Sequence, residues 1–188
     1  MWDKTVPMIS LAMRAASLQD IPVFDLPAPY AWRFYQPGDE RFWAQIETSA
    51  GEFVRPEDGL ARFPDIFNGK KLEERMIFLT EGGAPFATAT AWHAGEGEGL
   101  LHWVSVDAAH QGRGLSRVLV SLAMRRLREL GYASAFLTTQ TASWVAIKVY
   151  ARFGFRPVLR ARPDEEAGWR IVSEKTGIDF MRLLQTRG

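Results

Sequence analysis

The sequence predicts a single domain of the α/β class, in which a mixed sheet is flanked by helices. Three observations support this prediction. The length of 188 residues suits one domain with a sizeable core. Short apolar runs separated by turn residues indicate neighbouring antiparallel strands in the middle of the chain. Beyond them, a segment with helical periodicity lies between two further strands, and such a unit forms a right-handed crossover between parallel neighbours.

Residues 1–29 are expected to form an N-terminal arm that packs on a domain spanning residues 30–188. An apolar stretch, Val6 to Met13, precedes the segment IPVFDLPAPY, whose prolines exclude a sustained helix. The next run, AWRFYQPGD, predicts a strand that ends in a Pro-Gly turn, with Asp39 placed to cap a following helix. The irregular, aromatic-rich pattern of residues 51–71 predicts loops with a short helix or two.

The central part of the chain predicts three strands and a long helix. The runs MIFLT and FATATAW flank the turn EGGAP and predict a β-hairpin, and a glycine-rich link joins it to a third strand, LLHWVSV. From Leu115 apolar residues recur at helical spacing, and Gly131 follows as the residue that ends the helix. The apolar stripe is Leu115, Val118, Leu119, Leu122, Ala123, Leu127 and Leu130, and the opposite side carries Arg117, Ser121, Arg125 and Arg128.

The remaining segments continue the alternation of strands and helices. ASAFLTT predicts a strand parallel to LLHWVSV, and GFRPVL predicts the last strand. Between them lies a shorter helix, and a further helix is expected to begin at Pro163 and the acidic residues that follow it. The apolar stripe of the shorter helix is Ala142, Val145, Ala146, Val149, Tyr150 and Phe153.

Composition narrows the function classes. The formal net charge is +1 without a basic block, which argues against a nucleic-acid partner. The chain has no cysteine, which excludes disulfides, thiolate catalysis and cysteine-ligated zinc, and we expect no metal. Neither a signal peptide nor an apolar run of about 18 residues is evident, so we expect a cytoplasmic protein without a membrane partner.

The stretch HQGRGLS lies at the turn between the third strand and the long helix. Such a turn exposes backbone N–H groups and the positive end of the helix dipole, and glycine lets ligand oxygens approach the backbone, so the turn suits an anion. A dinucleotide fingerprint, G-x-G-x-x-G, would need glycine at position 117, which is Arg117. A phosphate-binding loop of the form G-x-x-x-x-G-K-S/T is also missing. A surface turn without a ligand is the alternative.

The turn resembles the Q/R-x-x-G-x-G/A motif of the GNAT superfamily of CoA-dependent N-acyltransferases, with Ser116 in the last position. The family's second motif, N-x-x-A-x-x-L/F-Y followed by G-F, is matched by Ser143 to Tyr150 and by Gly154-Phe155, with Ser143 in place of asparagine. The preceding strand lacks the proline of the family's L-x-V-x-P pattern. The resemblance covers residues 31–158, and it is most specific over residues 100–157.

The resemblance implies a GNAT fold, a mostly antiparallel mixed sheet whose two central parallel strands splay apart to admit CoA. It implies acetyl transfer from acetyl-CoA, as co-substrate, to a primary amine that attacks the thioester directly in a ternary complex. The acceptor is a small-molecule or peptide amine, and a homodimer stays open because dimers are frequent in the family. The residues that it assigns to CoA binding are Val104, Ser105, Val106, Gln111, Gly112, Arg113, Gly114, Leu115, Ser116, Arg117 and Ser143.

Four residues are candidates for catalysis or for the acceptor site. Tyr150 matches the family's tyrosine, which acts as the acid near the CoA sulfur, although a packed core tyrosine would give the same pattern. His102 is the preferred base, since its strand parity puts it on the face of Val104 and Val106 and since LHWVSV resembles the strand of arylalkylamine N-acetyltransferases. Its alternative is a half-buried strand histidine.

Glu47 and His93 are the candidates for the acceptor site, and Glu47 is also a second candidate base. A solvated acid at a helix end and a surface histidine are the alternatives. Aromatic residues mixed with Glu47, Glu52 and Asp58 would suit a cationic amine.

Two rival functions also remain: a non-catalytic acyl-CoA sensor or partner module, and an acyltransferase that uses a longer acyl-CoA.

Overall fold

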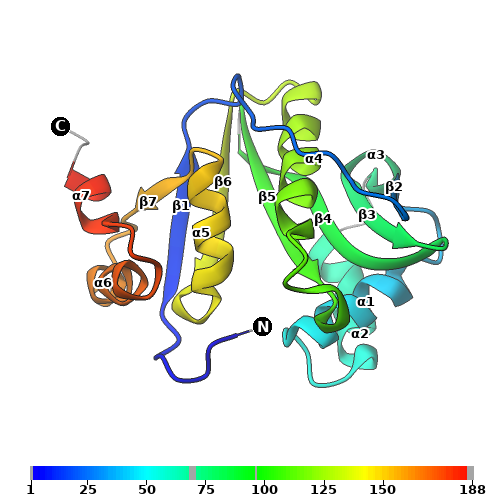
Figure 1. Ribbon diagram of the computed structural model, residues 1–188, viewed down its shortest axis with the longest axis horizontal. Helices are drawn as coiled ribbons and strands as arrows, with labels where there is room; N and C mark the ends of the chain where they lie inside the picture. The colour runs from blue at the N-terminus through cyan, green and yellow to red at the C-terminus, as the bar shows by residue number, and fades with distance from the viewer. Residues whose placement is uncertain (1, 68–70, 96, 186–188) are drawn as a thin grey trace.

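The computed structural model describes residues 2–67, 71–95 and 97–185. Their centre is a seven-stranded sheet in which only the pairing of β5 with β6 is parallel. This confirms the predicted mixed sheet (Figure 1). In spatial order the strands are β2 (Tyr30–Phe34), β3 (Met76–Glu81), β4 (Ala84–Gly95), β5 (Glu98–Val106), β6 (Ser134–Gln140), β1 (Ser10–Ala15) and β7 (Arg156–Val158).

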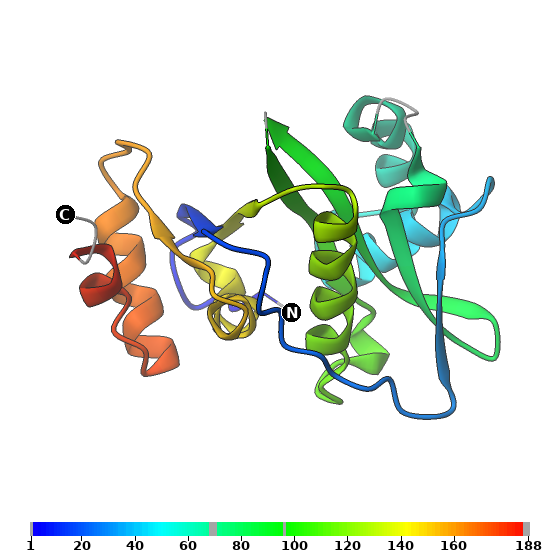
Figure 2. The same cartoon turned by 90° about the horizontal axis from the view of Figure 1, so that it is seen from above.

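Helices cover both faces of this sheet (Figure 2). One face carries α4 (Leu115–Glu129) over β3 to β5, and α5 (Trp144–Arg152) beside it. The other face carries α1 (Glu40–Ala50) and α2 (Pro56–Phe67), followed by the short α3 (Leu72–Arg75). α6 (Glu165–Thr176) packs on β1 and α5, and α7 (Phe180–Gln185) packs on α6. None of the described helices combines the length and the apolar character needed to cross a bilayer.

The expected N-terminal arm contains a strand of the sheet itself. β1 lies between β6 and β7 and is antiparallel to both. Leu11, Ala12 and Met13 are fully buried. The sequence did not reveal this strand because both of its faces are covered, so it shows no alternation of apolar and polar residues.

β5 changes course at a bulge. Opposite β4, Thr88 pairs with Ser105 and Thr90 pairs with His102, so β5 holds one residue more than β4 across this interval. Trp103, inside the bulge, has φ +47°, a left-handed conformation that is unusual for a residue other than glycine. A bulge bends the strand that carries it. Parallel pairing with β6 accordingly ends at Leu100, and beyond it the two strands diverge, as the resemblance implied (Figure 1).

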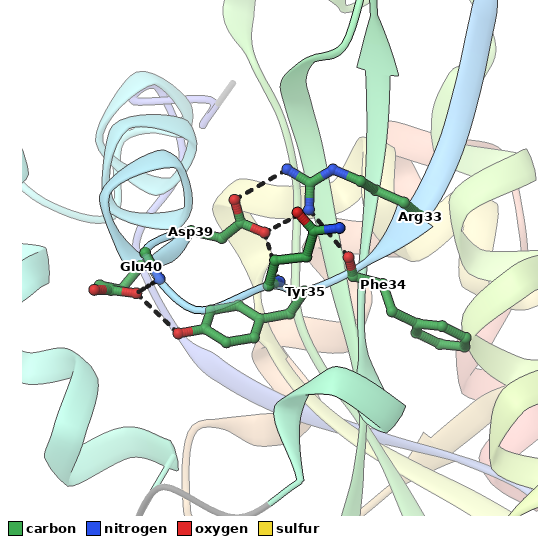
Figure 3. Close-up of polar contacts among 7 residues, drawn as sticks. Arg33, Phe34, Tyr35, Asp39 and Glu40 are labelled. Atoms are coloured by element: carbon green, nitrogen blue, oxygen red, sulfur yellow. Dashed lines mark hydrogen bonds and ion pairs between the residues drawn. The ribbon is translucent and has the colours of Figure 1, made fainter.

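Asp39 stands at the expected N-cap of α1, but its side chain does not cap the helix. Its carboxylate instead accepts hydrogen bonds from the guanidinium of Arg33, at 2.5 and 3.0 Å, and from the backbone N–H of Gln36 at 2.7 Å (Figure 3). The neighbouring Glu40 accepts from the Tyr35 hydroxyl at 2.8 Å. The Asp39 carboxylate therefore ties α1 to β2, which the ion pair with Arg33 favours over capping.

The polar side of α4 is partly covered by another segment of the chain. The segment that joins β1 to β2 crosses this side of the helix (Figure 1). Ser121 is 1% exposed, and its hydroxyl donates to the Pro22 carbonyl at 2.7 Å. The Arg128 guanidinium donates to the Gln19 carbonyl, and the Arg117 guanidinium lies 5.1 Å from the ring centroid of Phe24. The segment between β1 and β2 thus packs against the side of α4 that faces away from the sheet.

Because β1 is an inner strand, truncating its core should destabilise the whole domain. We expect Leu11→Ala to lower the free energy of unfolding by about 2–5 kcal/mol in urea titrations. Met8→Ala, in the same segment but 60% exposed, serves as the control and should change it by less than about 0.5 kcal/mol. Equal effects of the two substitutions would contradict the inner position of β1.

Candidate active site

A cavity of about 440 Å³ opens where β5 and β6 diverge. Its walls are the end of β5, the turn before α4, the end of β6 with the beginning of α5, and the end of α1. Candidate residues that lie far apart in the sequence therefore line the same cavity. Those that line it are Glu47, His102, Val104, Ser105, Val106, Gln111, Gly112, Gly114, Leu115, Ser116, Ser143 and Tyr150.

The glycine turn forms one end of the cavity. Gly112 and Gly114 have φ +77° and +74°, in the left-handed region that glycine adopts without a steric cost. A Cβ atom at Gly112 would meet no atom within 4 Å, so a ligand can approach the backbone there. Gly114 is the N-cap of α4 and, as a glycine, has no side chain to cap that helix. The first-turn amides and the helix dipole therefore offer an anion site.

Gln111 joins this turn to the end of β5. Its side-chain Nε2 donates to the carbonyl of Val106 at 2.8 Å. Next to it, the Asp107 side chain accepts from the backbone N–H of Ala109, and so shapes the single turn of helix that precedes the glycines. Asp107 thereby caps this turn. The residue after it stands where the family pattern has a proline.

Tyr150 projects from α5 into the cavity and is 8% exposed. Its ring meets Phe155 edge to face, with the centroids 6.0 Å apart. Burial, and after it the nearby negative charges of Glu47 and Glu52, raise the pKa of its hydroxyl well above the usual value. The phenol therefore stays protonated at neutral pH and is suited to donate a proton.

Glu47, near the end of α1, is fully buried and lines the same cavity. The Ser105 hydroxyl donates to its Oε2 at 2.6 Å, whereas none of the described residues donates to its Oε1. Burial raises the pKa of this carboxyl to about 8, and the charge of Glu52 acts in the same direction. A carboxyl that titrates near neutral pH beside a cavity is suited to accept a proton.

His102 also lines the cavity, but from a different face of β5 than the sequence predicted. The expectation that it shares a face with Val104 and Val106 is wrong, because the bulge at Trp103 reverses the alternation beyond it. The imidazole instead lies among aromatic rings, 6.0 Å from Phe67 and 5.8 Å from Trp103 between centroids. Burial lowers its pKa to about 4, so the ring is neutral at pH 7.

Three of the predicted residues are not brought to the cavity. The Arg113 guanidinium donates to the Tyr30 hydroxyl at 2.7 Å and to the Ala109 carbonyl, and that of Arg117 lies over Phe24. His93 stacks on Trp92 at the far end of β4, since it pairs with Gly99 at the start of β5, whereas the cavity lies at the end of that strand.

The structure adds residues that the sequence did not single out as site residues. Trp2 lines the cavity, and its side chain hydrogen-bonds with Glu52, which also lines it. Asp3 holds this segment in place: its backbone N–H donates to the Ala142 carbonyl at 2.9 Å, and its carboxylate accepts from Trp144 at 3.0 Å. No local pattern pointed to Trp2, because its neighbours in space lie far along the sequence.

Comparisons with known proteins agree with this geometry. The sequence model of the acetyltransferase (GNAT) family matches residues 40–155. A mycothiol acetyltransferase from Streptomyces bingchenggensis is 33% identical over 149 residues, which are 72% of this chain and 46% of that protein. A mycothiol acetyltransferase from Nocardia farcinica is 37% identical over 155 residues, 77% of this chain and 51% of that protein. The chain thus spans about half the length of the curated relatives it matches.

Solved structures support the fold. A GCN5-related N-acetyltransferase from Sphaerobacter thermophilus superposes with a TM-score of 0.66 at 22% identity, over 79% of this chain and 48% of that one. The ribosomal-protein-S18-alanine N-acetyltransferase from Escherichia coli superposes with a TM-score of 0.56 at 23% identity, over 69% of this chain and 79% of that one. At these sequence identities, the similarity to the two solved structures shows a shared fold only.

Burial of Glu47 should make stability depend on pH. Its pKa is about 8 in the folded state and 4.5 as the ordinary value. Below about pH 4.5 the carboxyl is protonated in both the folded and the unfolded state, so it does not reduce stability. As the pH rises from about 4.5 to about 8, the unfolded state loses this proton first, and the free energy of unfolding falls. Glu47→Gln keeps an acceptor for Ser105 and carries no charge. We expect it to gain free energy of unfolding relative to wild type between about pH 5 and 8.

Urea titrations at several pH values measure this difference. Glu57→Gln, which removes an exposed acid from α2, is the matched control and should follow wild type throughout. If the difference between Glu47→Gln and wild type did not change with pH, the carboxyl would not be buried as described.

Proposed function

The chain belongs to the acetyltransferase (GNAT) family, and we propose that it transfers an acetyl group from acetyl-CoA to a primary amine. The observation that carries the proposal is the cavity between β5 and β6. It combines an uncapped helix N-terminus at one end with a protonated phenol and a carboxyl of raised pKa. The relatives named mycothiol acetyltransferase support acetyl as the acyl group.

The glycine turn would bind the pyrophosphate of the donor. Backbone amides at the start of α4 supply hydrogen-bond donors, and the helix dipole favours negative charge. Ser116 lines the cavity at the one turn position that departs from the family motif, and its small side chain leaves the approach open. Val104 and Val106 lie on the stretch of β5 that has left β6, which suits pairing with the amides of the pantetheine arm.

We assign the role of general base to Glu47 in preference to His102. Both side chains line the cavity, but a base is most effective when its pKa lies near the working pH. The pKa of Glu47 is about 8, whereas that of His102 is about 4, so the imidazole is the weaker base. The free Oε1 of Glu47 gives it a lone pair for an incoming amine.

The reaction then balances with these two groups and solvent. The amine nitrogen attacks the thioester carbonyl carbon, and Glu47 takes one proton from the nitrogen. The C–N bond forms and the C–S bond breaks as the tetrahedral intermediate collapses. Tyr150 gives its proton to the departing thiolate sulfur. The proton on Glu47 returns to Tyr150 through solvent after the products leave.

Loss of the phenol should impair turnover more than donor binding. We expect Tyr150→Phe to lower kcat by about 10²-fold or more, because only the proton donor is removed. The KM for acetyl-CoA should stay within about threefold, since the turn that would hold the pyrophosphate is untouched. Thiol release from acetyl-CoA in the presence of an amine measures both constants. Unchanged turnover would contradict the role of Tyr150.

The two candidate bases can be separated by pH profiles of kcat/KM. Ser105 is hydrogen-bonded to Glu47, and the titratable groups that share the cavity with it are Glu52, His102, His110 and Tyr150. We expect activity of the wild type to rise with pH up to about 8, as Glu47 loses its proton. Glu47→Gln should abolish this rise, and His102→Asn should retain it. The opposite result would assign the base to His102. Titration of the amine itself is common to all three proteins and cancels in the comparison.

A further inference from the structure

Two carboxyl groups, those of Glu47 and Glu52, line the cavity. Glu47 and Glu52 lie at the end of α1, where the Glu52 backbone N–H donates to the Glu47 carbonyl at 2.9 Å. Among the residues that the structure describes, no lysine or arginine lines the cavity and neither carboxyl forms an ion pair. Glu47 is buried and Glu52 is half-buried. Because an unpaired carboxyl in such a place is driven toward its neutral form, a cationic ligand would favour the charged form of both.

The cavity also holds a buried polar atom that lacks a partner. Glu47 is 0% exposed, and within the described part of the chain its Oε1 accepts no hydrogen bond. Leaving such an acceptor unsatisfied is costly unless a ligand supplies the donor. An ammonium or amine nitrogen of an acceptor is a donor of the right kind.

One indole contacts the second carboxyl, and another lines the same cavity. The Trp2 side chain hydrogen-bonds with Glu52, and Trp103 lines the same cavity with Phe53 stacked on it at 5.8 Å between centroids. An indole N–H can only donate, so the bond orients the Trp2 ring against the carboxylate. A carboxylate beside an indole ring is suited to an alkylammonium group, through charge and cation–π attraction.

We propose that the acceptor is a linear diamine, whose reacting nitrogen lies at Glu47 and whose second, charged ammonium group is bound by Glu52 and Trp2. This inference rests on the proposed function, and it names the substrate class. An acceptor with a free carboxylate would be repelled by both acids. A monoamine would leave one acid without a partner. Burial raises the pKa of both carboxyls, and a bound cation would restore their charged forms.

The test compares three probes with the same four-carbon chain: the diamine putrescine, the monoamine n-butylamine and the amino acid γ-aminobutyrate. Calorimetric titration in the presence of CoA measures their affinities without turnover. Wild type should bind putrescine about tenfold or more tightly than the other two, as expected for a hydrogen bond between charged groups. Glu52→Gln should bring the ratio of putrescine to n-butylamine affinity close to one. Trp2→Ala should lower that ratio about two- to fivefold.

Two control variants match these changes outside the cavity. Glu57→Gln neutralises an exposed acid on α2, and Trp32→Ala removes a partly exposed indole from β2 at the edge of the sheet. Both should keep the wild-type ratio. Thermal unfolding of all four variants shows that each is folded before affinities are compared.

Undetectable putrescine binding, equal affinities for putrescine and n-butylamine, or an unchanged ratio in Glu52→Gln would each overturn the inference. Thiol release from acetyl-CoA tests the proposed function separately. Release with n-butylamine as readily as with putrescine would leave the acetyltransferase standing and overturn the diamine. Selective putrescine binding without any thiol release would support the recognition of a diamine and overturn the enzyme.

Discussion

The arrangement of this protein depends on the left-handed backbone of Trp103 in the middle of β5. A residue with a side chain adopts such a conformation at a cost of about 1–2 kcal/mol. Ring contacts offset this cost, because the indole packs edge to face on Trp43 and parallel to Phe53. The bulge bends β5 and reverses the alternation of its side chains between the two faces of the sheet. From this follow the separation from β6, the cavity between the strands and the approach of Ser105 to Glu47.

The N-terminal segment links the stability of the sheet to the completion of the site. β1 fills the position between β6 and β7, and the residues before it cross the end of β6 so that Trp2 reaches the cavity. Asp3, bonded to Ala142 and Trp144 and paired with Lys175, fixes the path of this segment. A change that loosens β1 would therefore disturb both the core and one wall of the site.

The buried acids illustrate a conflict between stability and chemistry. Glu47 has lost contact with water, and among the described residues only Ser105 donates a hydrogen bond to its carboxyl. In a purely structural role, an apolar side chain of similar size would serve at least as well. The same burial raises its pKa toward the range in which a base is useful. Tyr150 is buried in the same cavity, and this burial, with the charge of Glu47, raises the pKa of its hydroxyl. Acid and base are thus set by one environment.

The sequence by itself determined the parts that depend on neighbours along the chain. The helical period from Leu115, the left-handed Gly131 after α4, the hairpin of β3 and β4, and the glycine turn followed by Tyr150 were all predicted, because local backbone preference and periodicity encode them. Tertiary structure alone decided the place of β1, the face on which His102 lies, the burial of Glu47 and the position of Trp2. Each of these rests on contacts between distant segments: a strand buried on both faces has no period, a bulge reverses parity without a motif, and the charge of a carboxyl depends on what covers it.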